Sequence, residues 1–133
     1  VLGDGELQEG QVWEAAMFAG HKNLNNLTVI VDNNNLQIDG TVDAVNSPYP
    51  IDDKFKAFGF EVCVIDGNDF SQIEEAFSKV GTFDKPYAII AKTTKGKGVS
   101  FMENQVGWHG SAPNEEQYNT AMAELKAQLD ALN

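Results

Sequence analysis

A glycine-flanked aspartate near the start of the chain is the first stretch whose residues could do chemistry. Residues 3–10 read GDGELQEG, so that Asp4 lies between two glycines and further acidic residues follow. Glycine lets a ligand approach the main chain closely, and an aspartate is a hard oxygen ligand for Mg²⁺. A helix predicted over residues 11–21 would point its N-terminus at a bound phosphate. Taken alone, the stretch is more typical of an ordinary turn, because Gly-Asp-Gly is common in turns.

A second polar loop follows about thirty residues later. Residues 32–40 read DNNNLQIDG and come directly after the apolar run LTVIVD. Asparagines supply neutral oxygen ligands and tolerate unusual backbone angles, and a plain turn would need only one of them. If both loops end parallel strands, Asp4 and Asn34 lie at the same edge of the sheet. A carboxylate, an amide and a backbone carbonyl could there hold a Mg²⁺–diphosphate group.

The elements that must position these loops alternate between strands and helices. Short, nearly continuous apolar runs predict strands over residues 1–2, 27–32, 61–66 and 87–93. Apolar periodicity and capping residues predict helices over 11–21 and 50–58, over 72–80 with Ser71 as N-cap, and after Asn114 at the C-terminus. This order indicates an α/β fold with a parallel sheet and flanking helices. No repeat or linker divides residues 1–133, so a single, partial domain is expected.

Charge and composition exclude several classes of function. The 133 residues carry 20 acidic and 9 basic side chains, which gives a net charge of −11. Such an acidic chain is poorly suited to nucleic acid or anionic lipid, and no apolar run approaches the length of a membrane span. Cys63 is the only cysteine, so no internal disulfide can form. We therefore expect Cys63 to be a small core residue in a reducing, cytoplasmic setting.

Together the two loops resemble the signature of thiamine-diphosphate enzymes, in which GDG is followed about thirty residues later by NN. The segments GDGELQEGQVWEAAMFAG and NLTVIVDNNNLQIDG are similar specifically to transketolase. The similarity continues through KTTKGKG and WHG to a charged C-terminal helix and so covers nearly the whole chain. It implies a thiamine-diphosphate-binding fold and transfer of a two-carbon ketol unit from a ketose phosphate to an aldose phosphate.

The resemblance also implies a metal and cofactor site. Asp4 and Asn34 would bind Mg²⁺ (or Ca²⁺ or Mn²⁺) through their side chains, and Leu36 would bind it through its carbonyl oxygen. Gly5 and Asn34 would lie against the diphosphate of thiamine diphosphate.

Three further residues match the family on the catalytic side. His109, in GWHGSAP, would reach both the diphosphate and the donor sugar. Glu9 and Glu14 would join a carboxylate network at the interface with the partner subunit, and Glu9 is also expected near the cofactor. Lys95 and its neighbouring lysines could offer charge to a phosphate, although a solvated basic loop explains them equally well.

Within the family, a second domain from the opposite subunit holds the aminopyrimidine ring of the cofactor. The present chain contains only diphosphate-side motifs, so it is expected to be the C-terminal half of a transketolase N-terminal subunit, truncated before Val1 and inactive alone. Its expected partner is an aminopyrimidine-side chain or domain, within an oligomer that acts on sugar phosphates of the pentose phosphate pathway. Two alternatives remain: another thiamine-dependent ketol transferase or synthase, of the dihydroxyacetone or deoxyxylulose-phosphate type, and a non-catalytic oligomerisation or metal-binding module.

Overall fold

The chain folds around a four-stranded parallel sheet, and the computed structural model describes residues 1–132. The sheet has the strand order β1-β2-β6-β5, and its strands are β1 (Leu2–Gly3), β2 (Thr28–Asn33), β5 (Glu61–Asp66) and β6 (Tyr87–Lys92). A separate antiparallel hairpin pairs β3 (Leu36–Gln37) with β4 (Gly40–Thr41) just beyond the end of β2. The predicted α/β fold with a parallel sheet is therefore confirmed.

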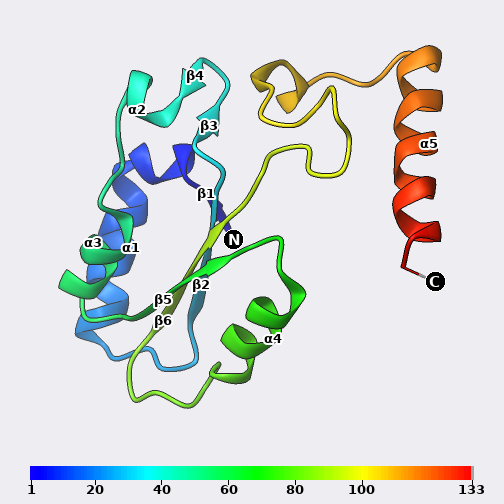
Figure 1. Ribbon diagram of the computed structural model, residues 1–133. Coiled ribbons are helices and arrows are strands. Elements are labelled where there is room, and N and C mark those ends of the chain that lie inside the picture. The colour runs from blue at the N-terminus through cyan, green and yellow to red at the C-terminus, as the bar shows by residue number, and fades with distance from the viewer. Residues whose placement is uncertain (133) are drawn as a thin grey trace.

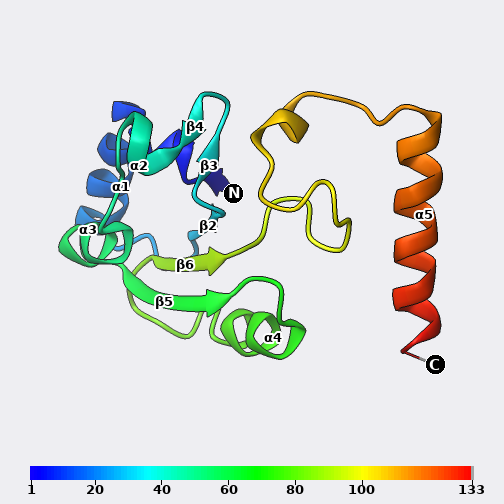
Figure 2. The same cartoon turned by 45° about the horizontal axis from the view of Figure 1, so that its top comes forward.

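Helices cover both faces of the sheet. The described residues form the helices α1 (Gly10–His21), α2 (Val42–Val45), α3 (Ile51–Ala57), α4 (Phe70–Ser78) and α5 (Glu115–Asp130) and the short 3₁₀ helices η1 (Gly5–Gln8) and η2 (Val106–His109). Helices α1 and α3 lie on one side of the sheet and α4 on the other (Figure 1 and Figure 2). Within residues 1–132, no helix is long and apolar enough to cross a membrane.

Strand β6 divides the core in two. It pairs with β2 along one edge and with β5 along the other, its two faces pack against different helices, and its residues 87–91 are all buried. Ala88 and Ile90 pack with α1, η1 and α3 residues, whereas Tyr87 and Ile89 pack with Ala76 of α4. Because successive strand residues point to opposite faces, one apolar run serves both layers. For this reason the sequence of β6 is continuously apolar over residues 87–91 and does not alternate between apolar and polar residues.

The predicted elements lie within a few residues of the observed ones, but one predicted cap is wrong. Asp69, not Ser71, is the N-cap of α4: its carboxylate accepts hydrogen bonds from the backbone N–H groups of Ser71 at 2.8 Å and Gln72 at 3.3 Å. The helix consequently begins at Phe70, and hydrogen bonding by these N–H groups and by the Gln72 amide lowers the pKa of Asp69. An aspartate two residues earlier outcompeted the serine because its carboxylate is the stronger acceptor for the free N–H groups.

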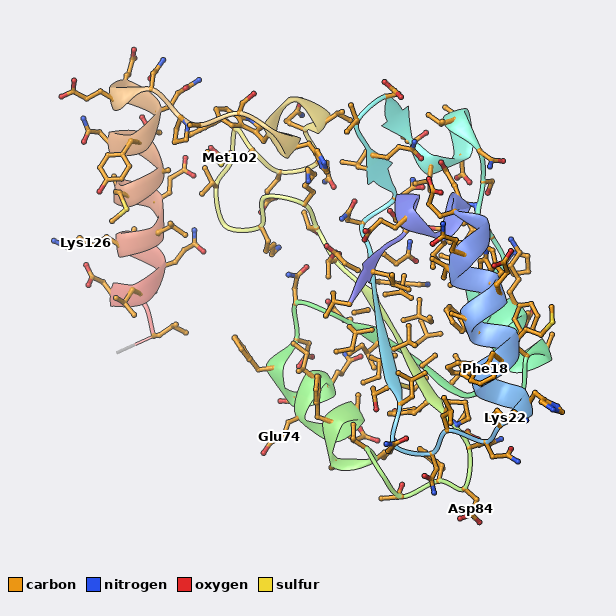
Figure 3. All side chains as sticks on the ribbon, turned by 180° about the vertical axis from the view of Figure 1, so that it is seen from behind. Phe18, Lys22, Glu74, Asp84, Met102 and Lys126 are labelled. Atoms are coloured by element: carbon orange, nitrogen blue, oxygen red, sulfur yellow. The ribbon has the colours of Figure 1, made fainter. Side chains whose placement is uncertain are left out.

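Helix α5 stands apart from the sheet (Figure 1). Asn114 and Gln117 form a capping box at its start, which confirms Asn114 as the predicted N-cap. Hydrogen bonds from Ser100 to Glu124 and from Gln128 to the Gly98 carbonyl join the helix to the preceding loop. Its predicted apolar stripe is largely exposed, with Tyr118, Met122, Leu125 and Leu129 between 42% and 60% accessible. Lys126 points away from the rest of the molecule in Figure 3.

One close backbone contact in the α1–α3 layer leads to a prediction about stability. A Cβ at Gly20 would lie only 1.7 Å from the Phe58 carbonyl oxygen, whereas a Cβ at Gly10, on the same helix, would meet nothing within 4 Å. Gly20→Ala should therefore lower the free energy of unfolding by about 1–3 kcal/mol or more, because the backbones must separate. Gly10→Ala is the matched control. Thermal unfolding of the complete protein tests this, and equal melting temperatures for the two variants would contradict it.

Candidate functional site

The parallel pairing of β1 with β2 brings the two polar loops together. Leu2 pairs with Val31 and Gly3 with Asp32, and the Asp4 N–H then donates to the Asp32 carbonyl at 3.0 Å. Both strands end at the same edge of the sheet, as predicted, and because the two strands are adjacent the GDG turn and the asparagine loop are direct neighbours.

The carboxylate of Asp4 is buried and only half satisfied. The residue is 1% exposed, and its Oδ2 accepts hydrogen bonds from Asn33 Nδ2 at 2.9 Å and from the Asn35 backbone N–H at 2.5 Å. Its Oδ1 has no hydrogen-bond partner among the described residues. A buried carboxylate oxygen without a partner is costly, since it has lost its water. A cation bound at Oδ1 would remove that cost.

The three consecutive asparagines have three different positions. Asn33 ends β2, is 6% exposed and lies beneath Asp4. The side chain of Asn34 accepts a hydrogen bond from the Leu36 backbone N–H at 2.9 Å, which tightens the turn into β3. Asn35 adopts a left-handed backbone with φ of 62°, a conformation that asparagine tolerates better than most residues. The three asparagines therefore have separate roles: Asn33 makes a buried hydrogen bond to Asp4, Asn34 tightens the turn, and Asn35 takes the left-handed backbone position.

The hairpin that follows packs tightly on η1. A Cβ at Gly5 would lie 3.0 Å from the Cβ of Gln37, so a side chain there would push the hairpin away. The Gln8 amide also donates to Gln37 Oε1 at 2.5 Å and to the Asn46 carbonyl at 2.7 Å. These contacts hold the hairpin over the GDG turn.

Beside these contacts lies an open cleft of about 770 Å³. Six of the seven predicted site residues line it: Asp4, Gly5, Glu9, Asn34, Leu36 and His109. Glu14 does not line the cleft. It is exposed on α1, and its role at a subunit interface stays a prediction.

His109 reaches the cleft on η2, a segment far along the chain. It is exposed, and η2 lies against β3. The neighbouring Trp108 anchors this segment, because its indole N–H donates to the Phe101 carbonyl at 3.1 Å and the two rings lie 5.4 Å apart. Of the described lysines, Lys95 alone lines the cleft.

The cleft is strongly acidic. Its lining includes the carboxylates of Asp4, Glu6, Glu9, Asp32 and Asp39. An anionic ligand would enter this cleft only if cations offset the carboxylates, since like charges at close range repel. Among residues 1–132, no three His, Cys, Asp or Glu side chains are grouped to hold a metal ion. The expected donor set is different, with one carboxylate, one amide and one backbone carbonyl, and it suits a hard cation that keeps further oxygens from its ligand.

Sequence reasoning missed two residues beneath this site. Asn33 was noticed only as one of three asparagines, and Tyr49, which accepts a hydrogen bond from Asn33 Nδ2 at 2.5 Å, gave no signal at all. An asparagine that ends a buried strand, rather than following it, was the available clue for Asn33.

Comparison with known proteins agrees with this geometry. Residues 1–130 match the family described as transketolase, thiamine diphosphate binding domain. Among curated proteins, the chain is 41% identical over 133 residues to an apulose-4-phosphate transketolase subunit of Phocaeicola vulgatus, covering 99% of this chain and 47% of that protein. It is 42% identical over 127 residues to the 6-deoxy-6-sulfo-D-fructose transketolase subunit SqwG of a Clostridium species, covering 95% and 46%.

A solved structure supports the same assignment. Transketolase from Campylobacter jejuni superposes with a TM-score of 0.87 at 39% identity, over 92% of this chain and 20% of that one. The chain thus spans about half the length of the curated relatives above. With the family match over residues 1–130 and the same fold in a solved transketolase, the chain belongs to the transketolase thiamine-diphosphate-binding domain family.

Proposed function

We propose that this chain forms the diphosphate-binding part of a thiamine-diphosphate-dependent transketolase, which moves a two-carbon ketol unit from a ketose phosphate to an aldose phosphate. The family membership and the names of the relatives support the proposal. The observation that carries it is the buried Asp4 Oδ1, which lacks a partner among the described residues and lies beside an acidic cleft. A cation–diphosphate pair satisfies both features at once.

In this proposal Asp4 and Asn34 bind a divalent cation through their side chains, and Leu36 binds it through its carbonyl oxygen. Mg²⁺ is the expected metal, with Ca²⁺ or Mn²⁺ as substitutes, because the donors are all hard oxygens. Gly5 lines the cleft, so its main chain would lie against the diphosphate, and its missing side chain leaves room for Gln37 of the hairpin. The cation also offsets the surrounding carboxylates.

When bound, thiamine diphosphate supplies the reactive carbon that breaks and forms the bond beside a ketose carbonyl. The chain's own residues bind and orient. His109, exposed on η2 and lining the cleft, would donate a hydrogen bond to oxygen of the cofactor or sugar. Lys95 adds the positive charge that an anionic ligand needs. Glu9 and Glu14 would face a partner subunit.

The partner in this proposal is a chain or domain that holds the aminopyrimidine ring, in an oligomer. Two relatives bear the names of transketolase subunits, which is why we include a separate partner chain. A cytoplasmic location is proposed from the single cysteine, Cys63, which allows no internal disulfide.

The direct test is ketol transfer by the complete protein together with its partner. With thiamine diphosphate, Mg²⁺ and a ketose–aldose phosphate pair, product should form, and omission of either the cofactor or the partner should abolish it. Cofactor-independent turnover, or none with a folded, cofactor-loaded assembly across a panel of sugar phosphates, would overturn the proposal.

One prediction from this proposal concerns the cation. Asp4→Ala should weaken Mn²⁺ binding to the cofactor-loaded protein by more than about 100-fold, beyond the loss typical of an outer-shell partner, because a direct ligand is removed. Asp84→Ala is the control: Asp84 is exposed just before β6, at the opposite edge of the sheet, and is labelled in Figure 3. Calorimetric titration with Mn²⁺ measures both. Equal affinities in the two variants would remove Asp4 from the site.

Another prediction from this proposal separates anchoring from catalysis at His109. His109→Ala should reduce kcat at saturating cofactor by more than it reduces cofactor affinity, since a donor to developing oxygen charge acts mainly in the transition state. His21→Ala, at the exposed end of α1, should change neither value. If only cofactor affinity falls in His109→Ala, the histidine is an anchor and the catalytic role is wrong.

A further inference from the structure

We infer that Asn33 and Tyr49 act as positioning residues that hold the Asp4 carboxylate in the orientation needed to bind a cation. The inference rests on the proposed function for the role of Asp4. It concerns two side chains that the sequence resemblance left without a role.

Asn33 uses both of its amide donors in specific contacts. Its Nδ2 donates to Asp4 Oδ2 at 2.9 Å and to Tyr49 Oη at 2.5 Å. A side-chain amide nitrogen has two N–H donors, so both are used. Because an ionised carboxylate only accepts, the amide must turn its nitrogen toward Asp4. The hydrogen-bond partners therefore fix which way Asn33 faces.

The contact with Asn33 also orients the Asp4 carboxylate. Two donors, Asn33 Nδ2 and the Asn35 N–H, converge on the same oxygen, Oδ2. With Oδ2 held, rotation of the carboxylate is blocked and, among the described residues, Oδ1 is left as the free acceptor. Groups that orient a ligand through hydrogen bonds commonly govern the affinity of a metal site. Asn33 thus selects the oxygen that faces the cation.

Lys54 holds the segment that carries Tyr49. Lys54 on α3 donates to the Pro48 carbonyl at 2.5 Å and lies 5.6 Å from the centre of the Trp13 ring on α1. These contacts secure the segment that carries Tyr49. On the other side, the N–H of Thr93, just beyond the end of β6, donates to the Asn33 carbonyl at 3.2 Å and so holds the Asn33 backbone. Asn33 is therefore held by groups from both sides.

The test measures cation affinity rather than activity alone. Mn²⁺ is titrated calorimetrically into the complete protein loaded with thiamine diphosphate. Tyr49→Phe removes one hydroxyl and should weaken Mn²⁺ binding about threefold to tenfold. Asn33→Ala should weaken it about tenfold or more, and Asn33→Ser, which keeps a short donor, should recover part of the loss. Tyr118→Phe, the same change on exposed α5, should have no effect.

A purely structural role predicts a different pattern. It would lower the melting temperature of Tyr49→Phe and leave Mn²⁺ affinity at the wild-type value, which would overturn the inference. If Asn33→Ala does not fold, Tyr49→Phe still decides the question. Loss of binding in Asp4→Ala with wild-type affinity in the Asn33 and Tyr49 variants refutes the positioning role alone. If the wild type binds no Mn²⁺, the proposed function itself fails.

Discussion

The register between β1 and β2 is the constraint on which the rest of the site depends. The Asp4 N–H continues the pairing one residue past Gly3 and so fixes Asp4 beside the end of β2. A one-residue slip would turn its side chain to the other face of the sheet. In the observed register the carboxylate is buried between strand ends, where only specific donors can satisfy it.

The core supports this register from the middle of the sheet. Strand β6 packs against both layers and pairs with β2 along its full length, from Thr28 to Asn33. Just beyond β6, the Thr93 hydroxyl donates to the Asp32 carboxylate and its N–H donates to the Asn33 carbonyl. These hydrogen bonds tie the polar loop to the apolar core, because the residue that follows β6 holds the last two residues of β2.

Negative charge matters more at the candidate site than over the rest of the protein. A net charge of −11 spread over a surface has little effect on the fold, but several of these carboxylates line one cleft. A cation is then a physical requirement for any anionic ligand there, rather than an optional addition. Asp4, whose Oδ1 has no partner among the described residues, also lines this cleft, so a cation bound there would offset the cost of its burial as well.

The sequence by itself determined the four strands of the parallel sheet and the longer helices, because most of them carry a local signal: continuous apolar runs for β2, β5 and β6, and a capping asparagine at Asn114 before α5. It also predicted that Asp4 and Asn34 lie at the same edge of the sheet, since both follow strands of a parallel sheet. Only the tertiary structure decided the strand order, the hairpin over Gly5 and the arrival of His109 from η2. Only the tertiary structure also decided the hydrogen bonds from Asn33 to Tyr49 and to Asp4. Such bonds join residues distant in sequence and depend on packing, so no periodic pattern in the chain predicts them.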